Sequence, residues 1–398
     1  MIESLPQNRR VLFYSHDGTG LGHLRITLGV ATAYAGLRPQ DSLLLLTGSL
    51  QASAFAHPQN LDYVKLPAMP KRELYSSLPP TEGYTGSHNS TIRFRTALAL
   101  ATIQGFDPHL VVVDHAPAGL FRELAPAIEW LRHAAEPKSL ALLMRDITFG
   151  PEQTRTIWKN EGVIPLLDEV YNQILIYGDQ QIFDPVTAYG MSQQAAAQTR
   201  FCGYLAPAPP LRSAKEVRAE SGAGTSPLVA VSVGGGADGS ALLRAYLTGL
   251  REGLGAPVQS HVVTGPLLPA QDRQEVADLI EGLSNINVID FDPDFAAVVR
   301  AADVVVCMGG YNSIVESVYF GKRPVVVPRI PGSEEQVLRA EGFARLGLAR
   351  VVGPASLTAT SLWEAIDAEL RDPLRSPSTL AFDGMDQIAR ELAHPPVV

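Results

Sequence analysis

The sequence predicts an α/β protein of two doubly wound domains, each a parallel sheet with helices on both faces. Three observations support this prediction. The chain has 398 residues, which is too long for a single hydrophobic core of ordinary size. Short, continuous runs of Val, Ile and Leu alternate with helical stretches, as in parallel strands that are buried on both faces. Several of these runs end in glycine-rich segments, at the strand ends where α/β sheets bind ligands.

The apolar runs define the strands of the two predicted domains. Those of the first half are 11–16, 42–48, 63–67, 110–115, 140–147 and 174–179. Those of the second half are 228–236, 260–265, 286–291, 303–310 and 324–329. Because carboxyl ends of parallel strands lie at one edge of a sheet, two such sheets facing each other would form a cleft there.

Composition sets the domain boundaries. Residues 206–227 are rich in Ala, Pro, Gly and Ser, which is typical of a linker. We therefore predict an N-terminal domain over 1–205 and a C-terminal domain over 228–375, with a short helix as an option inside the linker. The segment 376–398 is expected to cross back to the N-terminal domain. Residues 67–90 form a long irregular stretch, which favours a functional loop.

Charge and cysteine content exclude several classes of protein. The net charge is −9 and charged residues make up 18% of the chain, so neither a nucleic-acid partner nor disorder is expected. Cys202 and Cys307 lie in apolar stretches, as buried thiols of a reducing compartment do. Residues 1–10 lack the apolar core of a signal peptide, and no apolar run is long enough for a transmembrane segment. These features predict a cytoplasmic protein.

In each half of the chain, the first predicted strand is followed by a glycine-rich loop. Gly18, Gly20 and Gly22 precede His23, and a second loop occupies 234–236. Glycines at the start of a helix let a phosphate approach the backbone amides. The alternative interpretation is a tight turn with close helix packing. The spacing in the first loop fits neither a dinucleotide fingerprint nor a Walker loop.

The most specific motif spans 303–336. A strand ends at Gly309-Gly310, a helix is predicted to begin near Asn312-Ser313, and Glu316 then lies in its first turn. The pairs Ser313/Glu316 and Ser333/Gln336 also fit capping boxes, which leaves a purely structural interpretation open.

Residues 308–316 read Met-Gly-Gly-Tyr-Asn-Ser-Ile-Val-Glu. They resemble the donor signature His-Cys-Gly-Trp-Asn-Ser-x-x-Glu of family 1 nucleotide-sugar glycosyltransferases with the GT-B fold. The overall layout is closer to family 28, which includes the peptidoglycan N-acetylglucosaminyltransferase. This resemblance covers the first glycine loop with His23, the loop 234–236, Thr264-Gly265 and residues 288–306.

The resemblance implies a set of donor-binding positions. Glu316 would accept both ribose hydroxyls, Glu335 and Gln336 would hold the hexose, and the backbone of Phe291 would meet the base. The diphosphate would lie at the glycine loops and the start of the helix after Gly310. The full set is Gly20, Gly22, Gly235, Gly236, Thr264, Gly265, Phe291, Met308, Gly310, Asn312, Ser313, Glu316, Glu335 and Gln336.

This sequence also departs from the family patterns. Met308 replaces the histidine that touches phosphate in family 1, so that side-chain contact is lost, and Gly236 stands where family 28 often has serine. Arg323 and Arg329 are nearby cations without a predicted role. Asp292 and Asp294 form an Asp-x-Asp pair, but they close a strand and open a helix, so no metal site and no cofactor is predicted.

The resemblance places a histidine at His23, where a general base would take the acceptor proton during an inverting transfer. The alternative role is to bond backbone or position a phosphate. Asp114 and His115 end another strand and could orient His23 or bind acceptor, and Arg145-Asp146 end the next in the same way.

The predicted function is transfer of a hexose-type sugar from a nucleoside diphosphate to an acceptor. A uridine diphosphate sugar is the family's usual donor, with thymidine as the alternative, and the acceptor would be a small molecule or a lipid-linked group. Two other functions remain open at this stage, a nucleotide-sugar 2-epimerase of the same fold and a non-catalytic GT-B partner protein.

Overall fold

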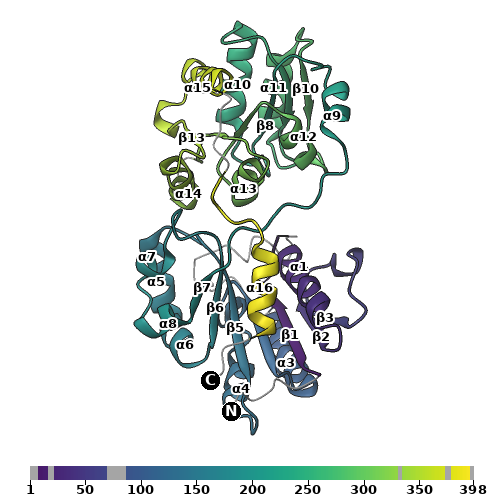
Figure 1. Cartoon of the computed structure of the whole chain (residues 1–398), viewed down its shortest axis with the longest axis vertical. Coiled ribbons are helices and arrows are strands. Elements are labelled where there is room, and N and C mark those ends of the chain that lie inside the picture. Colours follow the sequence, from purple (N-terminus) through teal and green to yellow (C-terminus); the bar gives the residue numbers. More distant parts are fainter. Residues whose placement is uncertain (1–7, 17–21, 70–86, 330–333, 373–377, 395–398) are drawn as a thin grey trace.

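The computed structural model describes residues 8–16, 22–69, 87–329, 334–372 and 378–394. They form two domains, each with one parallel sheet between helices (Figure 1). The strand orders are β3-β2-β1-β4-β5-β6-β7 and β10-β9-β8-β11-β12-β13. Both contain the 3-2-1-4-5-6 arrangement of doubly wound folds, so the predicted fold class is confirmed.

The first sheet consists of β1 (Arg10–Ser15), β2 (Ser42–Thr47), β3 (Leu61–Lys65), β4 (Leu110–Asp114), β5 (Ser139–Arg145), β6 (Gln173–Tyr177) and β7 (Thr199–Phe201). Its helices are α1 (Gly22–Leu37), α3 (Ser87–Phe106), α4 (Ala125–Arg132), α5 (Pro151–Glu161), α6 (Val163–Glu169), α7 (Pro185–Tyr189) and α8 (Gln193–Gln198). Every residue of β4 and β6 is buried, which explains why these strands read as unbroken apolar runs.

The second sheet consists of β8 (Leu228–Ser232), β9 (Gln259–Val263), β10 (Ile286–Ile289), β11 (Val304–Cys307), β12 (Val325–Val326) and β13 (Arg350–Val351). Its helices are α9 (Ala214–Glu220), α10 (Ser240–Glu252), α11 (Ala270–Ile280), α12 (Phe295–Ala301), α13 (Tyr311–Tyr319), α14 (Glu334–Arg345) and α15 (Ala359–Arg371). Each predicted run overlaps a strand. The sequence missed β7 and β13, because two or three residues make no apolar run.

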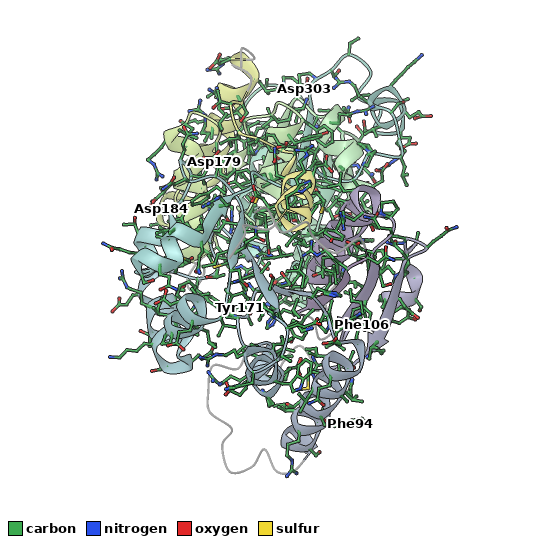
Figure 2. The ribbon with its side chains drawn as sticks, turned by 60° about the horizontal axis from the view of Figure 1, so that its bottom comes forward. Phe94, Phe106, Tyr171, Asp179, Asp184 and Asp303 are labelled. Atoms are coloured by element: carbon green, nitrogen blue, oxygen red, sulfur yellow. The ribbon has the colours of Figure 1, made fainter. Side chains whose placement is uncertain are left out.

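Two segments join the domains. Helix α9 lies inside the predicted linker, begins with a capping box between Ser213 and Glu216, and is anchored by Arg218, which donates to Asp303 at 3.0 Å. Figure 2 labels Asp303 in the C-terminal domain.

None of the helices in the described part of the chain combines the length and the apolar character needed to cross a bilayer.

The last helix, α16 (Gly384–Ala393), lies against α1 of the N-terminal domain (Figure 1). The Arg9 guanidinium donates to the carbonyl oxygen of Leu392 at 3.1 Å. A Cβ atom on Gly29 of α1 would lie 2.7 Å from the Met385 side chain. Glycine at this position therefore makes room for the Met385 side chain against the backbone of α1.

The domains meet where the carboxyl ends of β1, β4, β5 and β6 approach α13 and α14, a region called here the domain junction. Tyr311 of α13 inserts its buried ring between Tyr177 and Tyr204 of the N-terminal domain, with ring centroids 5.8 Å apart in each pair. Phe343 of α14 lies 5.5 Å from Tyr204 in the same way. One apolar cluster thus extends across both domains, and it fixes their facing edges.

Candidate active site

His23 and Asp114 meet at the domain junction. His23 is the second residue of α1, and Asp114 is the fully buried last residue of β4. The Nδ1 atom of His23 lies 2.7 Å from Oδ2 of Asp114. A buried carboxylate in this position holds the proton on Nδ1 and leaves Nε2 as the basic atom. The His23 side chain is 21% exposed, so a ligand can reach it.

Two further imidazoles complete a triangle around this pair. The ring of His16, directly after β1, lies 5.3 Å from that of His23, and the His115 ring lies 5.1 Å from it. Burial, with the neighbouring His23, lowers the pKa of His16 to about 4. Burial also lowers the pKa of His115 well below its usual value. Both rings are therefore neutral near pH 7. His16 was not predicted, although its place directly after a buried strand is the same signal that singled out Asp114.

The loop after β4 is strained. His115, Phe121 and Arg122 have positive φ angles of 67°, 49° and 62°, a conformation that is costly for side chains of this size. Tyr171, labelled in Figure 2, donates from its buried hydroxyl to the carbonyl oxygen of Pro117 at 2.5 Å and so tethers this loop. Such strain is concentrated at functional sites, which fits a loop that shapes a binding surface beside His23.

The glycine loops of the C-terminal domain pack against each other. Gly236 and Gly265 have φ angles of 91° and 81°, and a Cβ on either would lie 2.4 Å from the other loop's backbone. Any side chain at these two positions would push the loops apart. The buried Thr264 hydroxyl donates a hydrogen bond to Asp290 at 3.0 Å. The predicted contact of Thr264 with the nucleotide-sugar would therefore be made by its backbone.

Helix α13 presents its amino end at the domain junction. It begins at Tyr311 with Gly310 as N-cap and no side-chain cap, so Glu316 lies in the second turn and not in the first as predicted. The capping-box interpretation of Ser313 and Glu316 is therefore wrong. Asn312 is exposed and Ser313 half-buried, so the helix start reaches the surface, where the amides of a first turn favour an anion.

The remaining predicted donor positions differ in their exposure. Gly20 lies outside the described residues, whereas Gly22 is the first residue of α1. Met308 is buried in the core of the C-terminal domain, so its side chain faces away from the junction. Phe291 is 67% exposed just after β10, where its backbone stays accessible.

Glu316 is a half-buried carboxyl group at the domain junction. Burial raises its pKa to about 7, against the opposing influence of Arg25 from α1. Arg25 belongs to α1, so the electrostatic environment of Glu316 includes a helix of the N-terminal domain. Above about pH 7, where Glu316 is mostly ionised, a carboxylate in such a position binds hydroxyl donors strongly, because water competes little for it.

Glu335 and Gln336 lie in the first turn of α14. The Oε1 atom of the buried Gln336 accepts a hydrogen bond from the backbone N–H of Arg329 at 3.0 Å. This bond fixes the amide and leaves its NH2 group for another acceptor. Ser333, the other half of the second suggested capping box, lies outside the described residues.

The Asp-x-Asp pair is bound by the linker. The Arg212 guanidinium donates to Asp292 at 2.8 Å and to Asp294 at 3.1 Å. The other two cations noted in the sequence are also paired, Arg323 with the buried Glu369 and Arg329 with Asp238.

Because Arg212 already binds both aspartates, we expect turnover to persist in excess EDTA. The measurement is release of nucleoside diphosphate from a nucleotide-sugar with and without the chelator. Loss of turnover in EDTA that magnesium restores would contradict this prediction.

The comparisons with known proteins concern the family and the fold. Residues 230–389 match the model of the glycosyltransferase family 28 C-terminal domain. A curated relative is the UDP-N-acetylglucosamine--N-acetylmuramyl-(pentapeptide) pyrophosphoryl-undecaprenol N-acetylglucosamine transferase of Corynebacterium glutamicum (strain R). The two sequences are 36% identical over 91 residues, which are 23% of this chain and 24% of the relative.

Solved structures share the fold over nearly the whole chain. The calicheamicin glycosyltransferase CalG4 matches with a TM-score of 0.60 at 17% identity, over 97% of this chain and 94% of that one. The UDP-GlcNAc 2-epimerase of Methanocaldococcus jannaschii matches with a TM-score of 0.62 at 11% identity, over 97% and 99%.

These structures show that the chain has the GT-B fold. Its C-terminal half resembles family 28. The match spans only about a quarter of the length of that curated relative, so donor, acceptor and mechanism are matters for proposal.

Proposed function

We propose that the protein transfers a hexose-type sugar from a nucleoside diphosphate to an acceptor with inversion, using His23 as general base. The observation that carries the proposal is the 2.7 Å contact between His23 and the buried Asp114. This pair faces the domain that carries the donor motif. A base on one domain and a donor on the other is the arrangement that an in-line displacement requires.

In this proposal the acceptor hydroxyl or amine gives its proton to Nε2 of His23 as it attacks the anomeric carbon. Asp114 orients the imidazole and stabilises the imidazolium that forms. His16 and His115 stay neutral, since burial lowers the pKa of both. They therefore do not compete with His23 for the proton.

The C-terminal domain would hold the donor. Glu316 accepts the ribose hydroxyls, Gln336 and Glu335 hold the sugar, and the start of α13 stabilises the diphosphate as it leaves. Uridine is the proposed base and thymidine the alternative. The curated relative acts on a pyrophosphoryl-undecaprenol substrate, as its name states, so a lipid-linked acceptor is proposed beside a small molecule.

The deciding experiment incubates the protein with UDP-hexoses and thymidine diphosphate hexoses, with and without candidate acceptors. Chromatography and NMR then identify the products. We expect nucleoside diphosphate together with a product of inverted anomeric configuration. Because the epimerase fold is so similar, formation of a 2-epimer without nucleotide release would favour that function instead. Binding without any turnover would favour a non-catalytic partner.

A further inference from the structure

Arg145, the last residue of β5, lies at the domain junction beside the proposed active site. Its guanidinium carbon is 5.3 Å from the centre of the Tyr311 ring, which supports one face of the group. The side chain is half-buried. Its Nε atom is buried without a hydrogen-bond partner among the described residues.

The charge of Arg145 is not matched by a direct partner. The neighbouring Arg339, which is fully buried, donates to the Gly309 carbonyl oxygen at 3.2 Å and lies 3.9 Å from Asp146. Arg145 forms no such ion pair within the described ranges, and Glu335 and Asp146 act on it through longer-range electrostatics. Its surroundings raise the pKa of Arg145 despite burial, so the guanidinium keeps its charge, and a bound anion would displace no ion pair within the described ranges.

The neighbours of Arg145 indicate where such an anion would lie. On the acceptor side, Arg145 is among the charges that lower the pKa of His115. On the donor side, the negative charge of Glu335, the proposed sugar-binding residue, raises the pKa of Arg145. The geometry agrees, because Arg145 ends β5, which pairs with the strand that carries Asp114, and its guanidinium lies against Tyr311 of the helix that carries Glu316. The diphosphate has its own proposed site at the start of α13.

We propose that Arg145 forms an anion subsite that binds a carboxylate or phosphate carried by the transferred sugar or by the acceptor. The subsite rests on the proposed function, since it defines which substrates that function takes. The planar guanidinium can bind either group through two parallel hydrogen bonds, which an ammonium group cannot do.

The test uses calorimetry on the full chain with wild type, Arg145→Gln, Arg145→Lys and, as matched control, Arg155→Gln on the exposed face of α5. The titrants are UDP, UDP-glucose, UDP-glucuronate and inorganic phosphate, the last both with and without saturating UDP. Thermal melts check that each variant is folded.

We expect Arg145→Gln to leave UDP and UDP-glucose binding nearly unchanged. It should weaken either UDP-glucuronate or inorganic phosphate by about tenfold or more. A response to UDP-glucuronate assigns the anion to the sugar, and a response to phosphate assigns it to the acceptor. Arg145→Lys should retain part of the affinity, and Arg155→Gln should match wild type.

The inference is overturned if neither anion depends on Arg145, or if UDP itself weakens as much as they do. Failure of the proposed function looks different, because wild type would then bind no UDP at all. In that case the phosphate titration without nucleotide still decides whether Arg145 binds an anion.

Discussion

Replacing His23 by alanine is expected to lower kcat by about 100-fold or more, the usual scale for loss of a general base. The Kd for UDP should stay nearly unchanged, because His23 belongs to the N-terminal domain and the donor motif to the other. Steady-state kinetics with a saturating nucleotide-sugar, combined with calorimetric UDP binding, measures both quantities.

Two companion variants make the result specific. His133→Ala removes a histidine whose side chain is 72% exposed, and it should leave kcat unchanged. Asp114→Asn keeps the size of the side chain that contacts His23 but loses its charge, so kcat should fall while UDP binding persists. Wild-type turnover in His23→Ala would exclude the base role.

The Glu316→Gln variant is expected to bind UDP about 10- to 150-fold more weakly, since a charge-assisted hydrogen bond contributes about 1.5–3 kcal/mol. The amide keeps the size of the carboxylate but replaces one acceptor oxygen with a donor. A 2′-deoxyribose nucleotide should lose less affinity than its ribose counterpart, because it has one hydroxyl fewer. Glu364→Gln, at an exposed position of α15, is the control.

The same variant should gain stability relative to wild type as the pH rises. Burial raises the pKa of folded Glu316 to about 7 from an ordinary value of 4.5. The unfolded chain therefore loses this proton first, and wild-type stability falls as the pH rises from 4.5 to 7. Glutamine has no proton to lose. The difference in unfolding free energy should shift towards the variant by up to about 3 kcal/mol.

Denaturant unfolding at a series of pH values measures this shift. A difference between variant and wild type that stays constant with pH would show that Glu316 carries no burial cost. Normal UDP binding by Glu316→Gln would exclude the ribose role. The predicted combination, weaker binding with greater stability, is typical of a residue placed for function at the expense of the fold.

Much of the fold could be predicted because its signals are local in the sequence. Buried parallel strands appear as apolar runs, and glycines mark the loops that follow β1 and β8. Less of the candidate site could be predicted from the sequence. The start of α13 was misplaced because Gly310 caps the helix without a side chain, so the Ser313/Glu316 pair suggested a cap that does not form.

Contacts between distant segments could not be read from the sequence. His23 and Asp114 are 91 positions apart, and their approach depends on β1 and β4 being neighbours in the sheet. The influence of Arg25 on Glu316 requires two domains to meet. The unmatched charge of Arg145 is visible only once the partners of Arg339 and Arg329 are known.

The return of α16 to the N-terminal domain has a consequence for how the chain folds during synthesis. Ile388, Ala389 and Leu392 belong to the same apolar core as Val11 and Phe13 of β1. The ribosome makes these residues only after the whole C-terminal domain, so the first domain to emerge stays incomplete until then. Helix α1, which carries His23, gains its last packing partner at that late step. The proposed active site is therefore assembled only after both domains have been synthesised.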